Sequence, residues 1–105
     1  MISSQLLARV RTLTKTSSST PIVVFSSVFD KLFGLMFRKP DHCVYVFVFD
    51  HDVQHVFHTF FCKNLDFWFL DHHGRVIFTQ KNVKPFSLMR CSTPYRYVVE
   101  YFAES

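Results

Sequence analysis

Residues 65–76 read LDFWFLDHHGRV, and this stretch carries the clearest fold signal in the chain. It begins with a largely apolar run of the length of one strand and then reaches a short polar segment. Gly74 supplies the positive φ that a tight hairpin turn needs at that point. We therefore predict a β-hairpin in which residues 65–70 form one strand and residues 75–83 return as its partner.

Four further segments have the composition of strands. Residues 43–49 are almost uninterruptedly apolar, which is typical of a strand covered on both faces. Residues 21–26 are short and rich in β-branched side chains, and residues 55–61 are expected to form another strand. Residues 95–103 alternate in character and are expected to form the last strand.

The alternation in residues 95–103 also predicts which side chains share a face. Side chains two residues apart in a strand point to the same side of a sheet. One face is expected to carry the tyrosines with one valine, and the other to carry the charged residues. The first set is Tyr95, Tyr97, Val99 and Tyr101, and the second is Arg96 and Glu100.

A short helix is expected at about residues 28–38. Ser27 and Asp30 have the spacing of a capping box, and an apolar stripe at helical spacing follows them. Pro40 disfavours helical geometry at the residue before it and so ends the helix. With six to seven strands and this one helix, the predicted fold is mainly β, a small antiparallel sandwich or barrel.

Residues 1–20 allow two interpretations. Leu6, Ala8 and Val10 alternate with their neighbours as in a strand, and residues 16–20 form a polar connector. The absence of acidic residues and the many Ser and Thr also resemble an organellar transit peptide. We favour a first strand, and we expect residues 1–105 to form a single domain.

Charge and composition narrow the classes of partner. The formal net charge is +4, but the Lys and Arg residues are scattered, so a nucleic-acid partner is not expected. No apolar run approaches the length of a membrane-spanning helix, so no membrane partner is expected either. The three cysteines form no Cys-x-x-Cys pair, and we expect them to be reduced in a cytoplasmic protein.

The sequence offers little support for catalysis. Six histidines suggest a metal site, but His55 and His58 would point to opposite faces of a strand. There is no Gly-x-Ser-x-Gly elbow and no phosphate-binding glycine loop, since the chain has only two glycines. We therefore expect no catalytic residues, no metal ligands and no cofactor, and a protein that is not an enzyme.

Several short motifs recur in an order that resembles a known family. They are the GLMFR of residues 34–38, the aromatic-rich strand at 44–49, the Leu65-Asp66 pair and the YVVE of residues 97–100. In this order the chain resembles an archaeal-type member of the prokaryotic "domain of unknown function 192" family. The resemblance implies a mainly β, sandwich-like fold and brings no reaction with it.

The resemblance also maps the marked positions of the family onto this chain. They are Gly34, Leu35, Met36, Arg38, Leu65, Asp66, Asp71 and Gly74. Many bacterial relatives have a Trp-Met-Lys-Asn-Thr segment and a proline just before the Leu-Asp pair. Residues 58–64 here lack both the tryptophan and the proline, so a pocket built from those side chains is in doubt in this chain.

Three residues are the candidate ligand contacts: Arg38, His58 and Asp66. Arg38 could clamp an anion or pair with Asp66 or Asp71 inside the fold. Asp66 could instead accept backbone N–H bonds while Asp71 opens the hairpin turn.

Two functions remain open. The first is a non-enzymatic ligand-binding module with an aromatic-lined groove, and the alternative is an interaction or assembly protein with an exposed Phe-rich surface. An assembly protein of this kind could be a homo-oligomer.

Overall fold

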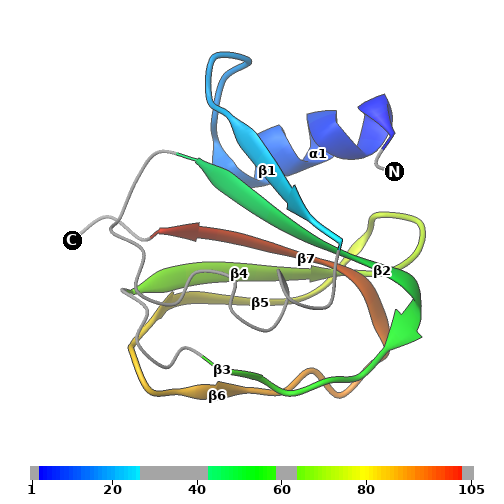
Figure 1. Ribbon diagram of the computed structural model, residues 1–105, viewed down its shortest axis with the longest axis vertical. Coiled ribbons are helices and arrows are strands. Elements are labelled where there is room, and N and C mark those ends of the chain that lie inside the picture. Colours follow the sequence, from blue (N-terminus) through cyan, green and yellow to red (C-terminus); the bar gives the residue numbers. More distant parts are fainter. Residues whose placement is uncertain (1–2, 27–42, 59–63, 103–105) are drawn as a thin grey trace.

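The computed structural model describes residues 3–26, 43–58 and 64–102. One helix and seven strands lie in these residues (Figure 1). In chain order they are α1 (Ser4–Thr14), β1 (Ile22–Phe25), β2 (Val44–Val53), β3 (Phe57–His58), β4 (Leu65–Leu70), β5 (Val76–Val83), β6 (Leu88–Met89) and β7 (Tyr95–Phe102).

Five of the strands form one open sheet in the order β1-β2-β7-β4-β5. All neighbours are antiparallel except β1 and β2, which run parallel. β3 and β6 pair separately as a two-stranded sheet. The predicted mainly β fold is confirmed, and the sheet is not closed into a barrel.

The N-terminal segment is a helix, so the predicted first strand is wrong. Ser3 caps α1 by accepting a hydrogen bond from the backbone N–H of Leu6 at 3.1 Å. Leu6, Val10 and Thr14 are the buried residues of the helix, and they recur every fourth position, as one helical face requires. Lys15 then ends the helix in a left-handed conformation with φ 56°.

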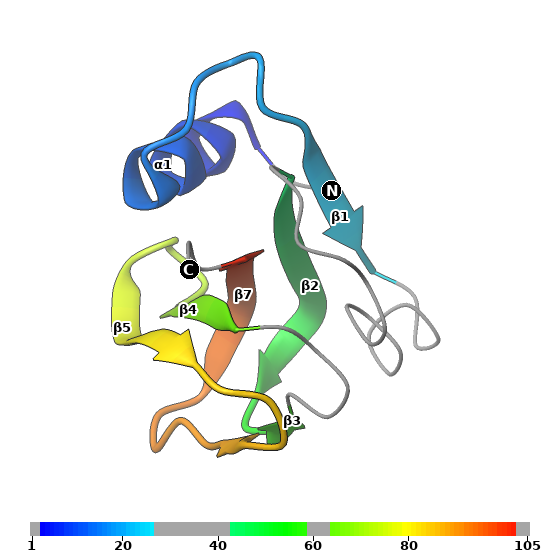
Figure 2. The same cartoon turned by 90° about the vertical axis from the view of Figure 1, so that its left-hand side faces the viewer.

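α1 covers one face of the five-stranded sheet, and the two-stranded sheet lies on the opposite side (Figure 2). Leu6 and Val10 pack in an apolar cluster with side chains from β2, β4 and β7. The sheet residues of this cluster are Val44, Val46, Trp68, Leu70 and Val99. The alternation of residues 6–11 suggested a strand, but the same stretch also has apolar residues four positions apart. In the fold, the residues with this spacing of four are the buried ones.

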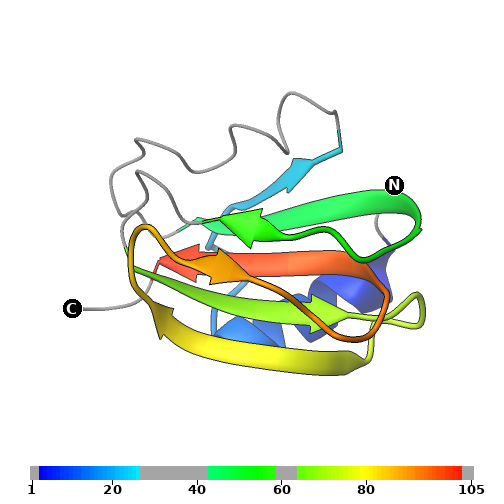
Figure 3. The ribbon, with the colours of Figure 1, turned by 90° about the horizontal axis from the view of Figure 1, so that it is seen from below.

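The other face carries an aromatic core. It contains rings from β1, β2, β4 and β7, and Met89 and Cys91 from the β6 segment pack into it. Its aromatic members are Phe25, Tyr45, Phe47, Phe49, Phe67, Phe69, Tyr95 and Phe102. Figure 3 shows β3 and β6 crossing in front of this face while α1 lies behind the sheet.

The predicted hairpin is confirmed. β4 has the bounds expected from the sequence, and β5 pairs with it in antiparallel register. Gly74 has φ +80°, and a Cβ placed there would lie 3.3 Å from the Leu6 side chain. The turn therefore needs glycine for its backbone conformation and for its close approach to α1.

The face assignment of the last strand holds with one exception. Tyr97, Val99 and Tyr101 pack on the α1 side, whereas Tyr95 lies in the aromatic core. The register between β2 and β7 shifts between the Val48 and Val53 pairs, and this irregularity interrupts the alternation. The helix expected at about residues 28–38 lies outside the described residues.

Candidate functional site

Glu100 lies in the middle of the aromatic core. It belongs to β7, the central strand of the sheet, and its register partners are Tyr45 on β2 and Phe67 on β4. Val98 and Phe102, two residues away on the same strand, are core residues of this face. Only 4% of Glu100 is exposed, and of the Asp, Glu, Lys and Arg side chains in the described part it alone is buried.

The rings of this face belong to one apolar cluster and contact one another in pairs. Tyr45 stacks on Phe25 with ring centroids 5.6 Å apart and meets Phe102 edge-on at 6.1 Å. Phe67 stacks on Phe69 at 6.2 Å. Because Tyr45 and Phe67 are the register partners of Glu100, the carboxyl-bearing residue is placed between aromatic residues on both neighbouring strands.

The surroundings of Glu100 disfavour its charge. Burial raises the pKa of the Glu100 carboxyl from an ordinary value of 4.5 to about 8. Burial therefore favours the protonated form of the carboxyl, and a ligand cation beside it would stabilise the ionised form.

Asp66, an acidic residue predicted as a ligand contact, has a structural partner. Its Oδ1 accepts a hydrogen bond from the backbone N–H of Asn82 at 2.7 Å. The pairing of β4 with β5 shifts register between Leu65 and Phe67, so Asp66 lies at a β-bulge. The backbone N–H bond is the structural role that the sequence left open for this residue.

The structure separates Asp66 from the layer that contains His58. Asp66 alternates with Phe67 of the aromatic core and so lies on the α1 side of the sheet. His58 is the second residue of β3, which pairs with β6 over the opposite face. The side chain of His58 and the whole of Arg38 lie outside the described residues, so their roles stay predictions.

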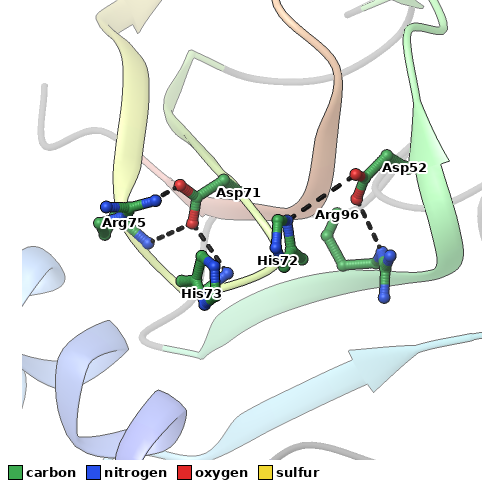
Figure 4. Close-up of polar contacts among 6 residues, drawn as sticks. All are labelled: Asp52, Asp71, His72, His73, Arg75 and Arg96. Carbon is green, nitrogen blue, oxygen red and sulfur yellow. Dashed lines mark hydrogen bonds and ion pairs between the residues drawn. The ribbon is translucent and has the colours of Figure 1, made fainter.

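Asp71 holds the β4–β5 turn together (Figure 4). Its Oδ1 accepts backbone N–H bonds from His73 and Arg75 at 2.9 Å, and its Oδ2 accepts from Arg75 Nε at 3.0 Å. Desolvation by burial opposes ionisation, but the hydrogen bonds from Arg75 and His73 outweigh it and lower the pKa of Asp71. Asp71 is thus a turn residue, as the sequence suggested.

A second polar group links three elements beside this turn. Arg96 Nε of β7 donates to Asp52 Oδ1 of β2 at 3.0 Å, and His72 Nδ1 lies 3.8 Å from Asp52 Oδ2 (Figure 4). These side chains are partly exposed, so the contacts stabilise the fold only weakly. Across residues 3–26, 43–58 and 64–102, no group of three or more His, Cys, Asp and Glu could hold a metal ion.

The family model of DUF192, described as "Uncharacterized ACR", matches residues 10–105. The chain belongs to the DUF192 family. No curated protein matches it. Two solved structures share the fold of this DUF192 chain at 21% identity and cover 78% of it.

The first solved structure is a protein of unknown function from Novosphingobium aromaticivorans DSM 12444, with a TM-score of 0.70. The DUF192 chain spans 62% of the length of that protein. The second is "a putative transcription regulator" from Sinorhizobium meliloti 1021, with a TM-score of 0.73 and 67% of its chain covered. At this identity the likeness shows the fold alone.

Glu100 was not among the residues that we selected from the sequence of this DUF192 chain. The alternation correctly placed it on the face opposite Tyr97 and Tyr101, but it was grouped there with the partly exposed Arg96. The available signal was its position between Val98 and Phe102 in the most apolar part of the strand. A charged residue between two core positions is itself a sign of a special environment.

Proposed function

We propose that this DUF192 chain is a non-enzymatic binding module for a small organic cation and that Glu100 is its anionic anchor. One observation carries the proposal: a glutamate on the central strand is only 4% exposed and lies between core aromatic residues of both neighbouring strands. Burial of a carboxyl disfavours its charged form. A ligand cation beside the carboxyl would stabilise that charged form and recover part of the free energy lost by desolvation.

The surrounding side chains favour a cation over an anion or a neutral ligand. The faces of aromatic rings carry negative charge density and attract ammonium groups. An ionised carboxylate adds a direct electrostatic attraction that is strong where water is excluded. An alkylammonium group therefore fits the chemistry of Glu100, Tyr45 and Phe67 better than a phosphate or a carboxylate does.

Of the three ligand contacts predicted from the sequence, we keep two and replace one. His58 lies in the layer over the Glu100 face, so we keep it with Arg38 as a predicted ligand contact. Asp66 is replaced by Glu100 as the acidic anchor because its carboxylate bonds to the Asn82 backbone. We further propose a cytoplasmic location, in which the half-buried Cys43 and the buried Cys91 would stay reduced.

The burial of phenylalanine favours the binding module over the assembly alternative. Six of the described phenylalanines lie in the aromatic core, and they are Phe25, Phe47, Phe49, Phe67, Phe69 and Phe102. Phe86 is the one phenylalanine among the large hydrophobic residues exposed in the described part. A surface rich in phenylalanine would need more of these rings outside the core.

Isothermal titration calorimetry with two probes of the same shape tests the proposal. Choline carries a permanent positive charge, and 3,3-dimethylbutan-1-ol is its neutral isostere. We expect saturable binding of choline and binding of the neutral alcohol that is weaker by about tenfold or more. The Glu100→Gln variant keeps the volume of the side chain and loses its charge, so it should bind both probes equally weakly.

Asp66→Asn is the matched control, because it removes a carboxylate from the α1 side and keeps an oxygen that can accept from Asn82. It should bind choline as the unmodified chain does. Absence of choline binding to the unmodified chain, or equal choline binding by the folded Glu100→Gln variant, would contradict the proposal.

A further inference from the structure

The segment around β6 shows a regular alternation of exposed side chains. Lys84, Phe86, Leu88 and Arg90 are all exposed, and Met89 between the last two is buried in the aromatic core. Phe86 is 64% exposed and Leu88 is 69% exposed. The outer side of this segment therefore presents two apolar side chains with a basic side chain at each end.

Val56 extends this surface across to the neighbouring strand. Phe57 pairs with Met89, so Val56 and Arg90 flank the same register pair on β3 and β6. Val56 is 44% exposed. We call the set Val56, Lys84, Phe86, Leu88 and Arg90 the β6 surface; it lies on the layer that crosses in front of the sheet in Figure 3.

Apolar exposure is concentrated on the β6 surface. Five large hydrophobic residues are exposed in the described part, and three of them are Val56, Phe86 and Leu88. Phe86 also has φ 62°, a left-handed backbone conformation that is unfavourable for a bulky aromatic residue. The fold thus holds a phenylalanine that is 64% exposed in an unfavourable backbone conformation.

The two charged residues of the β6 surface, Lys84 and Arg90, are both basic. Exposed apolar side chains next to basic ones are the combination by which peripheral proteins bind anionic membranes. The apolar groups enter the interface between headgroups and acyl chains, and the basic groups attract the anionic lipids.

We propose that the β6 surface docks this protein onto anionic membranes. A peripheral contact needs no spanning segment, and indeed no described helix is long and apolar enough to cross a bilayer. A second copy of the chain is a poorer occupant, because a symmetric contact would bring Lys84 and Arg90 close to their own counterparts.

Vesicle co-sedimentation tests this assignment. We expect the protein to sediment with vesicles of phosphatidylcholine and phosphatidylserine, to remain in solution with phosphatidylcholine alone, and to be released by high salt. Phe86→Ser/Leu88→Ser and Lys84→Glu/Arg90→Glu should each lower the partition coefficient by about tenfold or more. These side chains are exposed, so circular dichroism and melting temperature should show that both variants fold.

Arg9→Glu is the control for charge, because Arg9 is exposed on α1 at the opposite face. It should retain most of the vesicle binding. Absence of binding to the anionic vesicles, or binding unchanged in both double variants, would overturn the proposal. Binding to soluble poly-glutamate without binding to vesicles would also overturn it and would assign the surface to an acidic protein partner.

Discussion

Glu100 combines two properties that rarely occur together in a residue that serves only the fold. It is buried on the central strand, and its side chain is ionisable. Hydrophobic residues of similar size would pack between Tyr45 and Phe67 without the desolvation penalty. The residue therefore makes the unliganded fold less stable than it could be, which is expected at a binding site.

The desolvation penalty of the Glu100 carboxylate makes the stability of the protein depend on pH. The pKa of the Glu100 carboxyl is about 8 in the folded chain, and its ordinary value of 4.5 applies to the unfolded chain. Between these two pH values the folded chain therefore binds more protons than the unfolded chain. The contribution of Glu100 to stability is therefore fully present below about pH 4.5. It falls as the pH rises through this window, by an amount on the order of a few kcal/mol.

The Glu100→Gln variant should lack this pH dependence. Urea denaturation of the unliganded protein between pH 5 and pH 9 measures it, and the variant should become the more stable protein toward pH 9. Asp66→Asn serves again as the control and should follow the unmodified chain. Parallel curves for the unmodified chain and Glu100→Gln would show that the carboxyl is not held in its neutral form.

At the scale of elements, α1 stabilises the fold through one narrow face. Val10 is fully buried in the cluster with Val44, Trp68 and Leu70. Val10→Ala should lower the free energy of unfolding by about 1–3 kcal/mol, because it removes buried methyl groups and leaves a cavity. Arg9→Ala, at an exposed neighbouring position, should change the free energy by no more than about 0.5 kcal/mol.

Urea denaturation at pH 7 compares these two variants with the unmodified chain. Equal stability of Val10→Ala and the unmodified chain would show that α1 does not pack on the sheet as described.

Elements fixed by short-range signals could be predicted from the sequence. The hairpin of residues 65–83 was predicted correctly because its apolar run, turn and glycine are adjacent in the chain. α1 was missed because residues 6–11 also fit a strand, and only the contact with the distant strands β2, β4 and β7 makes the helical face the buried one. β6 was missed because it has two residues and no pattern of its own.

The candidate site was harder to predict than the fold for the same reason. Glu100 becomes unusual through its register with Tyr45 and Phe67, which are far from it in the sequence and meet it only in the sheet. Asp66 looked functional because it stands in an apolar run, but a bulge opposite it supplies a backbone N–H. Such bulges depend on pairing between strands and leave little trace in local composition.

At the scale of the whole molecule, the two faces of the sheet have different tasks. The α1 face is an aliphatic layer around Trp68 that stabilises the fold. The opposite face contains the aromatic core with Glu100, and the β6 surface lies on the layer that covers it. On this account, ligand binding and membrane docking use the same side of the protein and can be tested by separate variants.

The ionisation of Glu100 on ligand binding tests most sharply whether this carboxyl anchors a cation. Carboxyl ¹³C NMR at pH 7 measures it in the free protein and in the protein saturated with choline. We expect a protonated Glu100 carboxyl in the free state and an ionised one in the bound state. A Glu100 carboxyl that is already ionised in the free protein, or one whose resonance is unchanged at saturation, would rule out Glu100 as the anionic anchor.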